Sequence, residues 1–130
     1  MAQRLLLDTH TFLWWAFDDP RLSPAARAAI AEADNVCFVS AASAWEMAIK
    51  VSLGKLDVGG DLAGFLPQQL AASRLRLLPV DLPHALGVAA LPWHHRDPFD
   101  RLLVAQTQVE GLTLVSADAA LRAYGVPILW

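Results

Sequence analysis

The sequence predicts an α/β fold, a doubly wound and mainly parallel sheet of four to five strands with helices on both faces. Short apolar runs alternate with helix-length segments along all 130 residues, as in chains built from β-α-β units. The first run, Leu5 to Leu7, is apolar without a break, which is typical of a strand buried on both faces of a parallel sheet. No repeat, low-complexity tract or linker divides the chain, so we expect one domain over residues 1–130.

The first two helices are predicted from residues that favour helix ends. A helix over Thr9–Phe17 follows the first strand, and the Asp-Asp-Pro sequence of residues 18–20 breaks it. Ser23 is an N-cap and Pro24 takes the first helical position. We therefore expect a second helix that runs from this cap to about Ala33.

The middle of the chain continues the alternation. Val36–Val39 is β-branched and aromatic, which favours a second buried strand. A helix over Ala41–Leu53 follows and ends at Gly54, because glycine readily terminates helices. We expect a further helix over Leu62–Ser73 and a third strand over Leu77–Val80.

The clearest helix in the rest of the chain is Asp97–Val109, which ends at Gly111. The other elements expected there are a short helix over Leu82–Ala90, a strand over Thr113–Val115, a short helix over Ala117–Ala123 and an edge strand over Val126–Leu129. With these elements the pattern of strand and helix extends to the end of the sequence.

Composition excludes several classes of protein. Hydrophobic residues make up 55% of the chain and charged residues 18%, which excludes disorder. No apolar run approaches the roughly 18 residues of a membrane span and nothing resembles a signal peptide, so we expect no membrane association. Cys37 is the one cysteine, which excludes an internal disulfide and favours a reduced, cytoplasmic setting. The net charge of −3 argues against a protein that coats nucleic acid electrostatically.

Acidic side chains follow the predicted strands. Asp8 comes after the first strand, Glu46 lies in the helix after the second, and Asp118 comes after the fourth. Asp97 and Asp100 open the helix that leads into that fourth strand. In parallel sheets, sites gather beyond the carboxyl ends of the strands, so we expect these carboxylates to converge. Hard oxygen ligands without cysteine or paired histidines suit Mg²⁺ or Mn²⁺.

The same acids have a structural alternative as helix caps. Asp97 before a proline is a good N-cap with Asp100 as its partner, and Ser43 with Glu46 fits a capping box. Asp118 lies near the start of a short helix. Taken singly, each acid is more often structural than catalytic. The chain would then be a non-catalytic α/β binding module.

Several other residues have both a functional and a structural interpretation. Lys50 and Arg101 flank the acidic segments and are candidates for contacts to substrate phosphates, although solvated helix faces explain them equally well. For His94 and His95 a solvated loop is favoured over phosphate contact or proton transfer. We expect His84 at the surface, and the tryptophans mostly in the core or in interfaces rather than as base-stacking platforms.

Four motifs in this order, LLLDTH, SAWEMAIK, DPFDRLLVAQ and LVSAD, carry a resemblance to the PIN-domain ribonucleases, specifically the VapC-like toxins of toxin–antitoxin pairs. The resemblance covers essentially the whole chain and implies a PIN-like fold. It implies that Asp8, Glu46, Asp100 and Asp118 are the catalytic and metal-binding acids, with Asp97 as a helper.

The resemblance also extends to substrate and partners. Ser116 matches the family's serine or threonine two positions before the last aspartate, while His10 stands where many members carry a small polar residue. Both are therefore candidate substrate contacts. The family's activity implies an endoribonuclease that uses Mg²⁺, with Mn²⁺ able to substitute, and a cognate VapB-like antitoxin as partner. We expect RNA hydrolysis by a metal-activated water.

Two further expectations concern an alternative activity and the oligomeric state. LLLDTH also matches the start of aspartyl phosphohydrolases, but their second aspartate would fall at His10, so the acid–base group is missing. The Thr9–Phe17 helix is apolar nearly all round, which indicates burial on more than its sheet face. We therefore expect a homodimer that binds an antitoxin segment in a groove beside this helix.

Overall fold

All strands of the sheet run parallel. The computed structural model, which describes residues 2–130, places them in the order β3-β2-β1-β4-β5. The strands are β1 (Arg4–Leu7), β2 (Val36–Ser40), β3 (Arg76–Leu78), β4 (Thr113–Val115) and β5 (Ile128–Leu129). β2 and β3 thus lie on one side of β1, and β4 and β5, which come later in the chain, lie on the other side. The doubly wound parallel sheet predicted from the sequence is confirmed.

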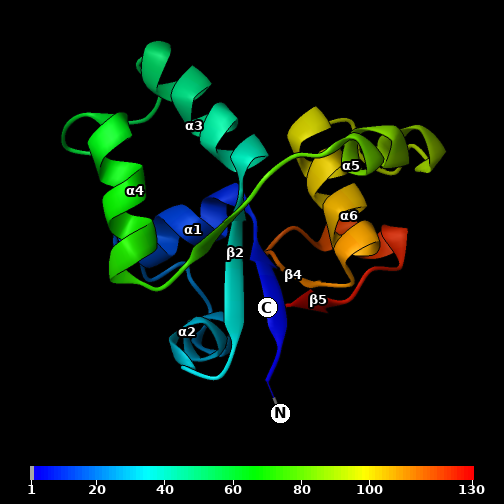
Figure 1. Cartoon of the computed structure of the whole chain (residues 1–130), viewed down its shortest axis with the longest axis horizontal. Coiled ribbons are helices and arrows are strands. Elements are labelled where there is room, and N and C mark those ends of the chain that lie inside the picture. The colour runs from blue at the N-terminus through cyan, green and yellow to red at the C-terminus, as the bar shows by residue number, and fades with distance from the viewer. Residues whose placement is uncertain (1) are drawn as a thin grey trace.

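Helices cover both faces of this sheet, as Figure 1 shows. They are α1 (Thr9–Ala16), α2 (Pro24–Ala31), α3 (Ala41–Ser52), α4 (Leu62–Ala72), α5 (Leu82–Gly87), α6 (Pro98–Glu110) and the 3₁₀ helices η1 (Val88–Ala90) and η2 (Ala119–Tyr124). Residues of α1, α2, α3 and α4 belong to one hydrophobic cluster, and residues of α6 and η2 belong to the other. Within residues 2–130 none of these helices is both long and apolar enough to cross a membrane.

The central position of β1 in the sheet explains why a continuous leucine run forms a strand. Leu5 and Leu7 point into one hydrophobic cluster, whereas Leu6 points into the other, and all three are fully buried. Leu6 pairs with Phe38 of β2 and Leu114 of β4, so β1 is central in the sheet. A central strand with both faces covered needs apolar side chains on every residue.

Some predicted boundaries are wrong. The third strand was expected over Leu77–Val80 but is Arg76–Leu78, because Pro79 has no N–H to donate to a neighbouring strand. The expected helix over Leu82–Ala90 divides into α5 and η1. The last short helix is a 3₁₀ helix that begins after Asp118, which caps it.

The apolar helix α1 is covered largely by its own chain. Trp14 packs against Trp130, with ring centroids 5.7 Å apart, and Phe12 meets Phe65 of α4 edge-on at 6.5 Å. Burial of this helix on more than its sheet face is therefore confirmed. The cover comes from α4 and the C-terminal residues, so the apolar character of α1 does not by itself require a partner.

Candidate metal centre

The candidate site lies at the carboxyl end of β1, the strand at which the sheet stops extending toward one edge and begins to extend toward the other. β1 has β2 on one side and β4 on the other, and the carboxyl ends of β1 and β4 lie side by side. The Asp8 N–H donates to the Val115 carbonyl at 3.1 Å, and the Thr11 hydroxyl donates to the same oxygen at 2.9 Å. Such reversal points are where open α/β sheets bind ligands. Asp8 follows β1 directly, and Asp118 lies three residues beyond the end of β4.

Asp8 can be both a helix cap and a member of the site. It is the N-cap of α1, and its Oδ1 accepts from the Thr11 N–H at 2.8 Å. The second carboxylate oxygen is not used by this cap. A buried aspartate can therefore cap a helix and still present an oxygen at the end of β1.

Glu46 is buried in the second turn of α3. Its Oε1 accepts from the Thr9 hydroxyl at 2.6 Å, and its Oε2 lies 2.9 Å from Lys50 Nζ. The expected capping box with Ser43 is wrong, because Ser40 caps α3 and Ser43 is buried inside the helix. Glu46 is thus tied to the residue that follows Asp8, which places it beside the end of β1.

Asp97 and Asp100 share the first turn of α6. Asp97 is the N-cap and its Oδ1 accepts from the N–H groups of Phe99 and Asp100, which confirms the capping prediction. Burial and the negative charges of Asp97, Asp8 and Glu46 together raise the pKa of Asp100 from 3.8 to about 7, while His95 opposes the shift. The acids expected to converge therefore act on one another electrostatically.

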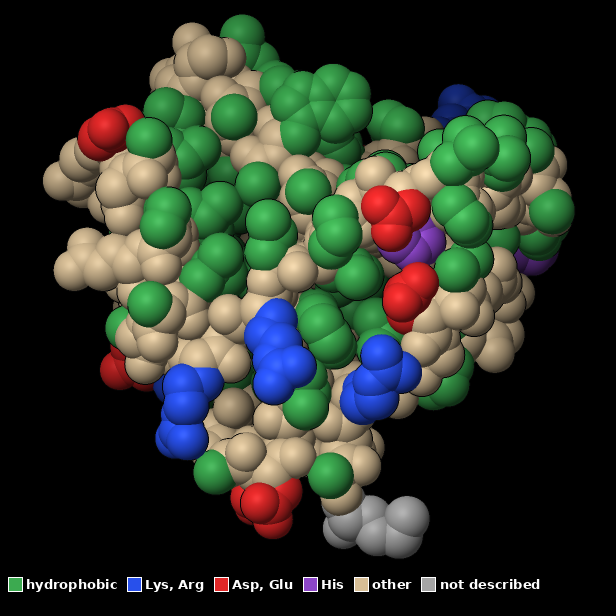
Figure 2. Space-filling view, viewed as in Figure 1, with side chains coloured by type: hydrophobic (Ala, Val, Ile, Leu, Met, Phe, Trp, Pro, Cys, Tyr) green, Lys and Arg blue, Asp and Glu red, His purple; other side chains and the backbone are tan. Residues whose placement is uncertain are grey.

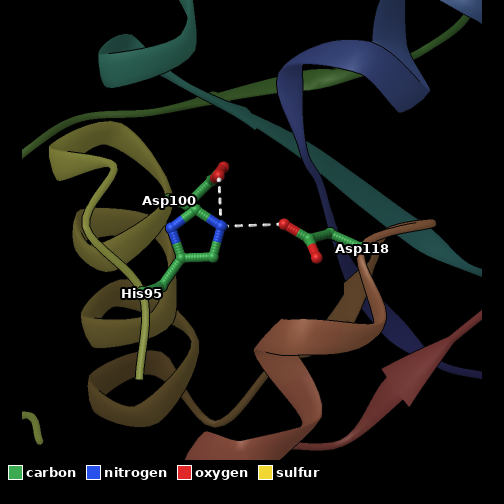
Figure 3. A group of neighbouring side chains, drawn as sticks. All are labelled: His95, Asp100 and Asp118. Atoms are coloured by element: carbon green, nitrogen blue, oxygen red, sulfur yellow. Dashed lines mark hydrogen bonds and ion pairs between the residues drawn. The ribbon is translucent and has the colours of Figure 1, made fainter. Parts of the chain in front are cut away.

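Among residues 2–130, the tightest group of possible metal ligands is His95, Asp100 and Asp118, whose ligand atoms all lie within 4.8 Å of one another. Figure 3 shows the imidazole of His95 between the two carboxylates. Its Nε2 lies 2.9 Å from Asp118 Oδ2 and 3.6 Å from Asp100 Oδ2. Asp8 and Glu46 stand outside this tight group.

The expectation that His95 belongs to a solvated loop is wrong. Its Nδ1 accepts from the Asp97 N–H at 3.1 Å, so in the neutral ring the proton belongs on Nε2, which faces the acids. The His95 N–H donates to the Tyr124 hydroxyl at 2.9 Å. Proximity to the DPFD motif was the only sign of this role in the sequence, since the loop conformation is set by contacts distant in the chain.

Two predicted substrate contacts are corrected by their burial. The Ser116 hydroxyl accepts from the Asp118 N–H at 3.1 Å, so this residue positions Asp118 instead of facing a substrate. Arg101 donates to the Pro92 carbonyl at 2.9 Å and to the Tyr124 hydroxyl at 3.1 Å. It fixes the loop that carries His95.

His10 and His84, two further histidines considered in the sequence analysis, differ in exposure. His10 is exposed beside Trp14, 5.8 Å between ring centroids, and is free to meet a substrate. His84 was expected at the surface but is buried, with Nε2 3.0 Å from a Glu110 carboxylate oxygen. Its Nδ1 accepts from the Asp81 N–H at 2.9 Å, which makes it part of the cap of α5.

The donor set fits a hard divalent cation. Carboxylate oxygens predominate at the ends of β1 and β4, and magnesium and manganese prefer such ligands. Burial first, and then the negative charges of Asp97, Asp8 and Glu46, raise the pKa of Asp100, and a bound cation would offset this repulsion. The cluster is therefore chemically suited to a divalent metal.

Comparison with known proteins agrees with the geometry. The family model of the PIN domain matches residues 5–127. Ribonuclease VapC22 of Mycobacterium tuberculosis (strain ATCC 25618 / H37Rv) is 35% identical over 124 residues, which cover 95% of this chain and 93% of that protein.

Solved structures share the fold. A chain of VapBC2 from Rickettsia felis, bound to a DNA fragment from its promoter, has a TM-score of 0.71 at 15% identity and covers 97% of both chains. VapBC-1 from nontypeable Haemophilus influenzae gives 0.66 at 13% identity, covering 97% of this chain and 96% of that one. FitAcB from Neisseria gonorrhoeae gives 0.62 at 20% identity and covers 95% of both.

Proposed function

The chain belongs to the PIN-domain family, and from this premise we propose that it is a metal-dependent endoribonuclease, the toxin of a toxin–antitoxin pair. A ribonuclease that is 35% identical over nearly the whole chain supports the activity. The observation that carries the proposal is the convergence of Asp8, Glu46 and Asp100 from three separate parts of the chain, close enough for the charges of Asp8 and Glu46 to raise the pKa of Asp100.

We propose that Asp8, Glu46, Asp100 and Asp118 hold Mg²⁺, with Mn²⁺ able to substitute and Asp97 assisting. A divalent ion bound there would lower the pKa of water and stabilise negative charge on the scissile phosphate. The chain supplies the positioning. Asp97 caps α6 and thereby orients the turn that carries Asp100, while Thr9 holds one oxygen of Glu46.

His95 and the protonation of Asp100 adjust the negative charge of the site. The Nε2 of His95 donates a hydrogen bond to Asp118 and lies 3.6 Å from Asp100 Oδ2, where the N–H dipole offsets negative charge. Because its pKa is raised, a cation bound at Asp100 would compete with a proton for the carboxylate. Hydrolysis by water, without participation of the RNA 2′-hydroxyl, leaves a 5′-phosphate on the downstream product.

The activity is tested by incubating purified protein with RNA in Mg²⁺ or Mn²⁺ and mapping the product ends. We expect 5′-phosphate ends from the wild type, none in EDTA, and none from Asp8→Asn. Asp34→Asn is the matched control, because Asp34 is exposed and lies before the amino end of β2, away from the site. This variant should cleave RNA like wild type. Cyclic phosphate ends, or full cleavage by Asp8→Asn, would contradict the mechanism.

We also propose a small VapB-like antitoxin as partner and a homodimer as the oligomeric state. The support for the antitoxin is the likeness to chains of VapBC assemblies. A hollow of about 260 Å³ lies beside α1, and Trp15, Ile30, Cys37 and Arg74 are among the residues that line it. An antitoxin side chain inserted there would provide the groove contact expected beside this helix.

A further inference from the structure

Two exposed tryptophans flank the turn that carries Asp100. Trp45 of α3 is 62% exposed and packs edge-on against Phe99, with ring centroids 5.2 Å apart. Trp93 is 78% exposed, and the Arg101 guanidinium lies 3.8 Å from its ring centroid. Phe99 and Arg101 are the two chain neighbours of Asp100, so each tryptophan is anchored beside that acid. These two tryptophans therefore lie outside the core of the chain.

We propose that Trp45 and Trp93 are stacking platforms for unpaired bases of single-stranded RNA on either side of the phosphate that lies at Asp100. This inference rests on the proposed nuclease function. Each ring is held by one neighbour and leaves most of its surface to solvent. Aromatic rings held in this way can stack on bases at little further entropic cost.

Two cations near the acids are already engaged. Lys50 pairs with Glu46, and Arg101 is buried in hydrogen bonds to carbonyls, whereas Arg96 is exposed. The chain carries a net charge of −3. Base stacking is a second strong source of affinity for single strands beside attraction to phosphate.

The conformation of the RNA decides whether its bases can reach these rings. Hydrophobic side chains make up much of the face seen in Figure 2. Bases inside a duplex are stacked on one another and cannot reach such rings, whereas bases of loops and single strands can. We therefore expect these two rings to select unpaired RNA over a duplex.

The test measures binding of fluorescein-labelled oligoadenylate by Asp8→Asn protein, which removes cleavage from the measurement. In that background Trp45→Ala and Trp93→Ala should each weaken binding by roughly five- to hundredfold. Trp45→Phe and Trp93→Phe should restore most of the affinity. Oligoadenylate should quench the intrinsic tryptophan fluorescence, and this quenching should be lost in the double alanine variant.

The matched control is Leu53→Ala, at the end of the same helix as Trp45. Leu53 is 61% exposed and lies about 12 Å further along the helix. It should bind RNA like its parent, and unchanged melting curves should show that every variant is folded. A duplex of the same length should bind more weakly than the single strand.

Three results would overturn the inference. The alanine variants could bind like Leu53→Ala, or duplex and single strand could bind equally. The variants could also keep RNA binding while losing an antitoxin segment, which would make the tryptophans a protein-binding surface. In each case cleavage by otherwise wild-type protein would still support the nuclease function. Absence of both RNA cleavage and RNA binding by wild type would overturn the proposed function and the stacking inference together.

Discussion

At the scale of single residues, the Asp100 carboxyl is the group whose ionisation reports on the whole acidic cluster. Its pKa rises to about 7, through burial first and then through the charges of Asp97 and Asp8. In the unfolded chain an aspartate has a pKa of about 4. Between these values the folded state keeps a proton that the unfolded state has lost. Stability without metal should therefore fall as the pH rises from about 4 to about 7.

Asp100→Asn should remove this pH dependence. The amide carries no charge at any of these pH values, so the variant should equal or exceed the wild type in stability at pH 8 in EDTA. Urea unfolding of both proteins at pH 5 and pH 8 measures the difference, with Asp34→Asn as the control for loss of an exposed charge. Parallel losses of stability in wild type and Asp100→Asn would contradict the raised pKa.

Arg101→Ala should act on stability and not primarily on substrate contact. The guanidinium is buried and donates to the Pro92 carbonyl and the Tyr124 hydroxyl. Hydrogen bonds to charged groups contribute about 1.5–3 kcal/mol each, so losing these two should lower the free energy of unfolding by roughly 3–6 kcal/mol. Denaturant unfolding measures this loss, and the exposed Arg122→Ala is the control. A variant as stable as wild type with a raised KM for RNA would restore the phosphate-contact interpretation.

At the scale of elements, substitutions of Asp97 at the N-terminus of α6 distinguish its role as a helix cap from the effect of its charge. Asp97→Ala removes the acceptor for two N–H groups and should cost about 0.5–2 kcal/mol of stability. Asp97→Asn keeps an acceptor but loses the charge, so it should be nearly as stable and should lower the pKa of Asp100. Unfolding curves give the first quantity, and carbon-13 NMR titration of the Asp100 carboxyl gives the second. An unchanged Asp100 pKa in Asp97→Asn would contradict the electrostatic coupling.

The elements that could be predicted from sequence are those set by local chemistry. β1 and β4 are short apolar runs, and α6 has a capping aspartate, a proline after it and a left-handed glycine at its end. The elements that were misjudged depend on distant partners or on single breakers. Pro79 ended β3 early, and the loop that carries Trp93 and His95 takes its shape from Arg101 and the Tyr124 hydroxyl. No local pattern encodes those contacts.

At the scale of the whole molecule, parallel topology explains why acids far apart in sequence were expected to meet. The sheet order brings the ends of β1 and β4 together and thereby places Asp8 near the segment that leads to Asp118. Sequence could not show that His95, instead of Asp8 or Glu46, joins Asp100 and Asp118 in the tightest group. That arrangement depends on side-chain packing, which the strand order alone does not determine.

The oligomeric state is a second property of the whole molecule. We expect a homodimer in solution, because exposed apolar side chains remain on the surface, among them Leu82 and Leu86 on α5. Light scattering combined with size-exclusion chromatography measures the mass, with and without the antitoxin. A monodisperse monomer at micromolar concentration that does not respond to the antitoxin would contradict this expectation.

The central claim is that the acids at the strand ends form a divalent metal site and are more than helix caps. Thermal melts of wild type and Asp100→Asn, in EDTA and in Mn²⁺, test it most directly. At about 100 times its Kd, Mn²⁺ should stabilise the wild type by about 2.7 kcal/mol and Asp100→Asn by much less. In EDTA at pH 8 the variant should melt no lower than wild type. A variant that melts clearly lower in EDTA, yet gains as much from Mn²⁺ as wild type, would show that Asp100 serves the helix and not the metal.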